Sequence, residues 1–267
     1  PTTRTTWPVF ETWTAFFTFP DGLTCPFENW GMGMAAEYTA KKYNISREDQ
    51  DAFALESHHR AAAGQKSGAF KKTIAPIEVP GRKGPTIFSE DESIRPEVTM
   101  ADLQKLKPAF QKDGTVTAGN ASQLTDGAAM ALLASEEEAT KRGWPVRAKV
   151  IAHTTFGVEP KELFIAPVGA VRQLVEKADL KLKDIDLFEI NEAFAAQMLA
   201  CMRQLELSHD RVNVLGGAIA LGHPIGCSGT RVLTTLIDAL ETRNLKRGIA
   251  TLCLGGGNAV AMLIERP

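Results

Sequence analysis

The part of the chain after Pro145 alternates short apolar strands with amphipathic helices, and this pattern limits the possible folds more than any other feature. In chain order, the predicted elements are a strand at 146–153, a helix at 167–178, a strand at 186–190, a helix at 191–205, a strand at 212–215, a helix at 228–242, and two strands at 248–254 and 259–265. Such alternation is typical of a sheet with crossover helices. The sequence therefore predicts an α/β fold.

Three polar or reactive side chains lie at or just beyond the ends of these predicted strands. Asn191 follows the strand at 186–190, His223 lies between a glycine and a proline, and Cys253 precedes three glycines. In open α/β sheets, ligands bind beyond the carboxyl ends of the strands. A histidine and a cysteine brought together there can exchange protons with a bound carbonyl compound. Taken singly, each residue has a structural alternative: a helix N-cap, a core histidine or a buried thiol.

The part of the chain before Pro145 is less regular. A helix is predicted at 47–66, with Ser46 as its N-cap and Gly68 at its end. A short strand is predicted at 74–79 and an amphipathic helix at 126–141. The pair His58-His59 is interpreted as part of a solvated helix face, without a metal. Residues 1–20 have no clear period and receive no function.

Composition excludes several functions. The 267 residues carry a formal net charge of −2, which gives no basic footprint for nucleic acid. No apolar run has membrane-spanning length, and the first residues lack the order of a signal peptide. The four cysteines have irregular spacing and no CxxC pair, which indicates reduced, mostly buried thiols. We therefore expect a cytoplasmic protein without a structural metal.

Several longer strings resemble those of thiolases. They are NEAFAAQ (191–197), NVLGGAIALGHPIGCSG (213–229) and ATLCLGGGNAVAMLIE (250–265), with SREDQDAFALESHHRA (46–61) and DGTVTAGNASQLTDGAAM (113–130) upstream. The resemblance implies a layered αβαβα fold with a C-terminal βαβαβαββ-type domain at 146–267. It also implies a CoA-covering loop domain at 21–124 and a remnant of the N-terminal domain at 125–145, with the rest of that domain missing.

The resemblance also implies a reaction and its residues. CoA thioesters such as acetyl-CoA and acetoacetyl-CoA would be substrates of a reversible Claisen condensation and thiolysis, without a bound cofactor. His223 would activate the nucleophile, Cys253 would be the general acid and base, and Asn191 would hold a water in an oxyanion site. The backbone of Gly255 would also face the thioester oxygen.

Two further residues are assigned to CoA by the same resemblance. Arg95 would lie against the adenine and ribose-phosphate end, where the alternative is a surface ion pair. Ser122 would contact the pantetheine arm, where the alternative is an ordinary turn. The family also implies a homodimer or homotetramer.

The nucleophilic cysteine of the family comes from its N-terminal half and has no counterpart here. Cys25 lies in a proline-flanked loop, and Cys227 is interpreted as structural. Gly31 stands where many thiolases have a histidine. Three hypotheses therefore remain: an acetyl-CoA C-acetyltransferase-like enzyme, a long-chain 3-ketoacyl-CoA thiolase, and a catalytically silent fragment that binds CoA or a partner.

Overall fold

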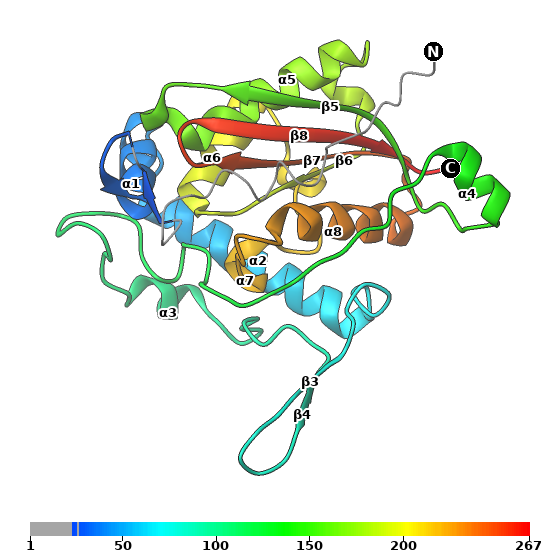
Figure 1. Cartoon of the computed structure of the whole chain (residues 1–267). Coiled ribbons are helices and arrows are strands. Elements are labelled where there is room, and N and C mark those ends of the chain that lie inside the picture. Colours follow the sequence, from blue (N-terminus) through cyan, green and yellow to red (C-terminus); the bar gives the residue numbers. More distant parts are fainter. Residues whose placement is uncertain (1–22, 26) are drawn as a thin grey trace.

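A four-stranded mixed sheet forms the centre of the molecule in the computed structural model, which describes residues 23–25 and 27–267 (Figure 1). Its strands are β5 (Lys149–Gly157), β6 (Leu187–Ile190), β7 (Arg247–Leu254) and β8 (Asn258–Glu265), in the spatial order β5-β8-β7-β6. β6 and β7 are parallel, whereas β8 is antiparallel to both of its neighbours. The strand–helix pattern of the sequence has therefore produced an α/β sheet.

Helices cover both faces of this sheet. α5 (Ala166–Lys177) and α6 (Ala195–Leu205) share one core with Ala259, Ala261 and Leu263 of β8. α8 (Ser228–Thr242) shares the other core with Met262 and Ile264 of the same strand. Figure 1 shows α5 and α8 on opposite sides of the sheet. Because successive side chains of a strand point to opposite faces, a strand buried on both faces is apolar throughout.

The turn between β7 and β8 is built from glycines, as the sequence predicts. Gly256 and Gly257 have φ angles of +81° and +91°, which side chains disfavour. A Cβ atom on Gly257 would also lie 2.4 Å from the backbone oxygen of Val158. This tight turn begins two residues after Cys253, so the backbone at Gly255 to Gly257 carries no side chains.

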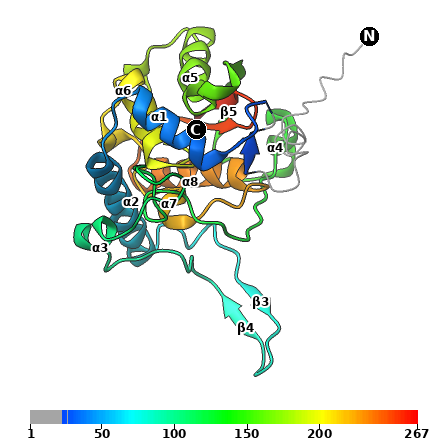
Figure 2. The same cartoon turned by 90° about the vertical axis from the view of Figure 1, so that its left-hand side faces the viewer.

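Two helices from the first part of the chain extend the molecule beside α6. α1 (Met32–Lys42) contacts α6, and α2 (Arg47–Ser67) contacts both α6 and the short helix α7 (Ala218–Leu221) (Figure 2). Ser46 caps α2 by accepting a hydrogen bond from a backbone N–H of the first turn, and Gly68 ends it with a φ of +78°. Both predicted ends of this helix are confirmed.

The remaining elements are short. They are the antiparallel pairs β1 (Thr24–Cys25) with β2 (Trp30–Gly31) and β3 (Ile77–Val79) with β4 (Thr86–Phe88), the helices α3 (Met100–Gln104) and α4 (Glu136–Arg142), and the 3-10 turns η2 (Pro160–Ile165), η3 (Leu182–Asp184) and η4 (His209–Arg211). The β3–β4 hairpin projects from the body of the molecule in both views (Figures 1 and 2). Among the described helices, none is long and apolar enough to cross a bilayer.

The helix predicted at 126–141 is wrong over most of its length. Only α4 is helical there, and it begins at Glu136, where Ser135 caps it. Met130 and Leu132 upstream are 92% and 79% exposed. An amphipathic helix gains most of its stability by burying its apolar face. Within residues 23–25 and 27–267, nothing covers these side chains, so this stretch has no regular structure.

The strand predicted at 212–215 is also wrong, because Asn213 interrupts it. Asn213 has a φ of +47°, and the residues around it form only isolated bridges. Its side-chain amide instead accepts from the backbone N–H of Ile190 and donates to the Ile190 oxygen, both at 2.8 Å. One asparagine side chain thus replaces the strand partner that the end of β6 would otherwise have.

Three predicted boundaries move for similar reasons. The helix predicted from residue 191 begins at Ala195, so Asn191 is not its N-cap. β5 lies a few residues later than predicted because its partner β8 sets its limits, from Lys149 opposite Glu265 to Gly157 opposite Asn258. The strand predicted at 74–79 is shortened to β3, whose partner β4 offers three residues.

Candidate active site

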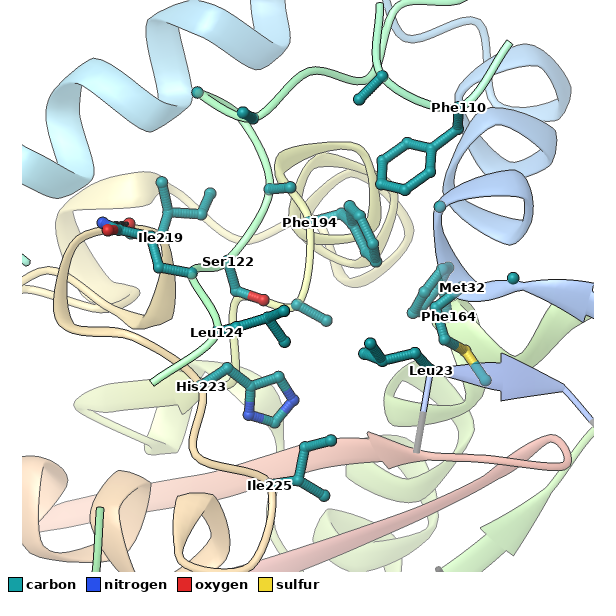
Figure 3. Close-up of a pocket in the computed structure, with 18 of the residues that line it drawn as sticks. Leu23, Met32, Phe110, Ser122, Leu124, Phe164, Phe194, Ile219, His223 and Ile225 are labelled. Carbon is teal, nitrogen blue, oxygen red and sulfur yellow. Dashed lines mark hydrogen bonds between the residues drawn. The ribbon is translucent and has the colours of Figure 1, made fainter. Parts of the chain in front are cut away.

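A pocket of about 870 Å³ opens at the end of β7. Its lining comes from the segment 118–124, the segment around His223, the end of β7, the start of α1, and the aromatic residues Phe110, Phe164 and Phe194. Figure 3 shows the imidazole of His223 and the hydroxyl of Ser122 facing the space that these apolar side chains border. The pocket therefore combines a large apolar wall with a few polar groups, as ligand sites usually do.

The structure brings the residues singled out from the sequence to this pocket, with one exception. Those that line it are Arg95, Ser122, His223, Cys253 and Gly255. Asn191 does not line it; it is 1% exposed and contacts His223 from behind.

The backbone around His223 is fixed on both sides. Gly222 before it has a φ of +90°, and a Cβ atom there would lie 2.4 Å from the side chain of Thr125. The backbone N–H of His223 donates to the oxygen of Gln123 at 3.0 Å. The amide of the Gln123 side chain in turn donates to the backbone oxygens of Ser93 and Ile219. These hydrogen bonds therefore link the backbone of His223, through Gln123, to the segments that contain Ser93 and Ile219.

Ser228 favours one tautomer of His223. Nδ1 lies 2.6 Å from Oγ of Ser228, and this hydroxyl donates to the backbone oxygen of Pro224 at 3.0 Å. With its hydrogen directed to Pro224, Oγ accepts from Nδ1, which favours the proton on Nδ1. Nε2 of the neutral ring is therefore the free base.

The side chain of Asn191 supplies the partner of that base. Asn191 follows β6, where its backbone N–H pairs with the oxygen of Thr251 on β7. Its Nδ2 lies 3.2 Å from Nε2 of His223, and its Oδ1 accepts from Arg231 at 3.1 Å. The arginine can only donate, so it decides which end of the amide faces the histidine.

The surroundings of His223 keep it neutral. Burial and, second, the nearby Arg231 charge together lower its pKa to about 4. Both effects disfavour the imidazolium form. At neutral pH the ring is therefore an unprotonated base with its lone pair on Nε2.

Cys253 is the one described cysteine that lines the pocket. It is the last residue but one of β7 and is partly buried, whereas Cys25, Cys201 and Cys227 are buried and lie outside the lining. Burial raises the pKa of the Cys253 thiol to about 12. The group is therefore a protonated thiol at neutral pH, which makes it a proton donor first and a base only when a substrate or the pH favours the thiolate.

Ser122 is positioned by pairing between two distant segments. Its backbone N–H donates to the oxygen of Ala193, and Ala121 forms a bridge with Phe194. Gln197 holds the same loop by accepting from the backbone N–H of Ala193 at 3.1 Å. These bonds place the Ser122 hydroxyl at the pocket wall (Figure 3).

Arg95 and His58 are linked at the opposite end of the pocket. The backbone N–H of Arg95 donates to Nδ1 of His58 at 3.2 Å. His58 is 3% exposed, so the prediction that it lies on a solvated helix face is wrong. Burial lowers its pKa to about 4, which preserves the lone pair that accepts this bond. The guanidinium of Arg95 is exposed at the pocket edge and, within the described residues, forms no ion pair with a carboxylate.

Two sequence comparisons agree with this geometry. Residues 11–137 match the profile described as "Thiolase, N-terminal domain", and residues 144–266 match "Thiolase, C-terminal domain". The chain belongs to the thiolase family.

Individual thiolases are similar over most of this chain. An acetyl-CoA acetyltransferase from Chromobacterium violaceum is 51% identical over 248 residues, which is 92% of this chain and 63% of the relative. A probable acetyl-CoA acyltransferase from Staphylococcus aureus is 48% identical over 247 residues, again 92% of this chain and 63% of the relative. The chain thus spans about 63% of the length of these relatives.

Solved thiolase structures share the fold. The acetyl-CoA acetyltransferase of Bacillus anthracis superposes with a TM-score of 0.90 at 47% identity, covering 92% of this chain and 62% of that one. The human mitochondrial 3-ketoacyl-CoA thiolase gives a TM-score of 0.86 at 42% identity over the same shares. The predicted thiolase-like layered fold is therefore confirmed.

The sequence alone does not identify several residues around this pocket. Ser228 and Arg231 lie on a predicted helix and Glu189 lies on a predicted strand, without a signal for any further role. No local pattern identifies them, because their partners lie on other elements. The apolar wall was missed for the same reason: its members come from segments far apart in the chain, namely Met32, Phe110, Phe164 and Phe194.

Proposed function

We propose that this chain carries the proton-transfer and CoA-binding residues of an acyl-CoA C-acyltransferase. The reaction is the reversible condensation of two acyl-CoA molecules and thiolysis of the 3-ketoacyl-CoA product, with acetoacetyl-CoA as the favoured 3-ketoacyl substrate. One observation carries the proposal: a neutral His223, with its free Nε2 beside the Asn191 amide, shares a pocket with the thiol of Cys253.

His223 and Asn191 suit a negatively charged oxygen. When Nε2 takes a proton from an attacking thiol, its new N–H lies beside the N–H of the Asn191 amide, 3.2 Å away. Two donors that face each other in a buried site are unfavourable unless an acceptor lies between them. The oxygen of a thioester enolate accepts from the new N–H of His223, and Asn191, which lies outside the pocket lining, reaches that oxygen through a water, so the pair stabilises the enolate more than the neutral thioester.

Cys253 suits the proton transfer at carbon. In thiolysis, the carbon–carbon bond of acetoacetyl-CoA breaks, and the departing enolate needs a proton at its C2 atom. The thiol of Cys253, protonated at neutral pH because its pKa is raised to about 12, is in the form that donates it. In condensation the thiolate takes the same proton from acetyl-CoA. The backbone of Gly255 lines the pocket beside it and offers an N–H for the thioester oxygen.

Arg95 and Ser122 are the proposed contacts of CoA. Arg95 is exposed at the edge of the pocket, where a guanidinium can stack on adenine and bind a phosphate with its planar fork. Ser122 faces the same pocket as His223, where its hydroxyl can contact the pantetheine arm of a bound CoA (Figure 3).

The apolar wall of the pocket favours a second candidate substrate. Met32, Phe164 and Phe194 border a space that a longer acyl chain would fill. The human relative, named a 3-ketoacyl-CoA thiolase, keeps this alternative open. The ratio of kcat/KM for acetoacetyl-CoA and 3-ketooctanoyl-CoA decides between them.

Two further properties belong to the proposal. The four unpaired cysteines support work in a reducing compartment such as the cytoplasm. Exposed apolar side chains on the β3–β4 hairpin, Ile77 at 59% and Ile87 at 66%, support a homodimer or homotetramer. Light scattering on the purified chain tests the assembly.

The proposed chemistry is tested by proton exchange. The purified chain is incubated with acetyl-CoA in D₂O, and deuterium in the acetyl methyl group is measured by mass spectrometry. We expect exchange in the wild type, because neutral Nε2 of His223 can take the proton of the Cys253 thiol, the thiolate can then take a proton from the methyl carbon, and the new Nε2–H holds the enolate oxygen. Cys253→Ala and His223→Ala should each lose the exchange, and the step needs no acyl-enzyme. Binding of CoA by all three proteins, without exchange in any of them, would refute the proposal and support a silent CoA-binding role.

A further inference from the structure

Arg231 reaches the reactive histidine through a chain of side chains. It is the fourth residue of α8 and does not line the pocket. One guanidinium nitrogen donates to Oδ1 of Asn191 at 3.1 Å, and another lies 3.4 Å from Oε1 of Glu189. The Glu189 side chain is 2% exposed and that of Arg231 is 17% exposed. An ion pair is thus held inside the protein, directly behind Asn191.

This placement is unfavourable for an arginine that serves stability alone. A positive charge in the first turn of a helix opposes the helix dipole. Nε of Arg231 is buried and has no hydrogen-bond partner among the described residues, which costs free energy. A buried ion pair is often no more stabilising than apolar side chains of similar volume. A role in stability therefore does not explain why an arginine stands at this position. The contact between Arg231 and Asn191 offers another explanation.

We propose that Arg231 is a positioning residue: it holds the Asn191 amide with Nδ2 toward Nε2 of His223, and Glu189 is its buried counter-ion. An unrestrained amide can turn by 180° and present Oδ1 instead. Oδ1 would favour a proton on Nε2, which is the wrong tautomer for a base. Arg231 prevents this because a guanidinium has donors only, so it binds Oδ1 and leaves Nδ2 for the histidine.

The charge of Arg231 acts on the same ring. His223 has a pKa lowered to about 4, first by burial and then by Arg231. The ionisable groups that interact with Arg231 are Glu189 on β6, Glu192 after it, Asp91, Cys227 and His223 itself. Cys253 shares the pocket with His223. Removal of the arginine charge should therefore raise the pKa of His223 toward its usual 6.5.

This inference rests on the proposed function only for its effect on rate. Its effect on the tautomer of His223 is measurable whether or not the chain turns over substrate. The experiment uses the whole chain with ¹⁵N-labelled histidine, and the ¹⁵N shifts report which ring nitrogen is protonated. The His223 signals are assigned by their loss in His223→Gln.

Three variants separate orientation from charge. Arg231→Met removes both, Arg231→Lys keeps the charge without the fork, and the double variant Glu189→Gln/Arg231→Met avoids a buried unpaired carboxylate if the first variant does not fold. Arg243→Met, an exposed arginine just past the same helix, is the matched control.

We expect one tautomer, with the proton on Nδ1, in the wild type and in Arg243→Met. Arg231→Met and the double variant should show a mixture of tautomers and a higher pKa of His223. Arg231→Lys should keep the pKa low but show part of the mixture, because a shorter point charge does not reach Asn191 and Glu189 with two separate nitrogens as the fork does. The exchange rate of acetyl-CoA should fall roughly ten- to a hundred-fold at unchanged KM, as the loss of one charge-assisted hydrogen bond implies. A single Nδ1–H tautomer in the folded Arg231→Met or double variant would overturn the inference. Absence of exchange in the wild type would refute the proposed function and leave the tautomer result intact.

Discussion

Oγ of Ser228 lies 2.6 Å from Nδ1 of His223 and 3.0 Å from the backbone oxygen of Pro224. One hydroxyl therefore accepts from the histidine and donates to the loop that carries it. This contact favours the Nδ1–H tautomer of His223, and the Asn191 amide held by Arg231 favours the same tautomer from the Nε2 side.

Replacement of Ser228 by alanine should lower the exchange rate of acetyl-CoA by roughly tenfold or more at unchanged KM, because Nδ1 then has no acceptor and the tautomer is free to change. Thr242→Ala, which removes a hydroxyl at the far end of the same helix, should leave the rate unchanged. A rise in KM with the rate preserved would contradict this role of Ser228.

Removal of the proposed CoA contacts should affect binding and not chemistry. Arg95→Ala and Ser122→Ala should each raise KM for acetyl-CoA, by up to about tenfold, with little change in kcat, because these contacts are made equally by substrate and transition state. Titration calorimetry with CoA measures the same loss directly. Arg82→Ala, at the turn of the projecting hairpin, is the control. A fall in kcat alone would place either residue in the chemistry.

His209 should make the fold sensitive to acid. Burial lowers its pKa from 6.5 to about 4, so the unfolded chain binds a proton first and the native state loses stability as the pH falls through this interval. His209 stacks on Phe53 with ring centroids 4.8 Å apart, so His209→Phe keeps the packing and removes the proton site.

We expect urea unfolding to show that His209→Phe loses roughly 1–2 kcal/mol less than the wild type between about pH 6.5 and pH 5. Buried Glu189, whose pKa burial raises while its partner Arg231 opposes the rise, is present in both proteins and cancels in the difference. Parallel pH profiles of the two proteins would contradict the assignment.

The 267-residue chain by itself should not produce acetyl-CoA steadily from acetoacetyl-CoA and CoA. Of its cysteines only Cys253 lines the pocket, and its raised pKa suits a proton donor better than a nucleophile. Mass spectrometry should find no acetylated cysteine. Steady turnover that is abolished by Cys25→Ala or Cys227→Ala would identify a substitute nucleophile and refute this expectation.

The sequence predicts those parts of the fold whose signals are local. α8 occupies the predicted interval 228–242, and α2 has its predicted cap and end, because caps and helical periodicity act within a few residues. The same reasoning fails at Asn213 and at 126–135. The side chain of Asn213 takes the place of a strand partner for β6, and the segment 126–135 has an amphipathic pattern but nothing that covers its apolar side chains among the described residues.

The candidate site was predictable only where its residues lie in recognisable strings. His223 and Cys253 do, and both line the pocket. Arg231 does not. Its role depends on a contact with the side-chain amide of Asn191, which lies 40 positions earlier in the chain and is brought next to Arg231 only by folding. The role of Asn191 was also incomplete from the sequence, because its contact with Arg231 exists only in three dimensions.

Ser228 and Arg231 stand three positions apart on α8, so one turn of a single helix bears on both nitrogens of the His223 ring, directly at Nδ1 and through Asn191 at Nε2. A small displacement of that helix carries both restraints in the same direction. Asn191 itself follows β6, so the Nε2 side of the ring depends on how α8 is placed against the sheet, whereas the Nδ1 side depends on α8 alone.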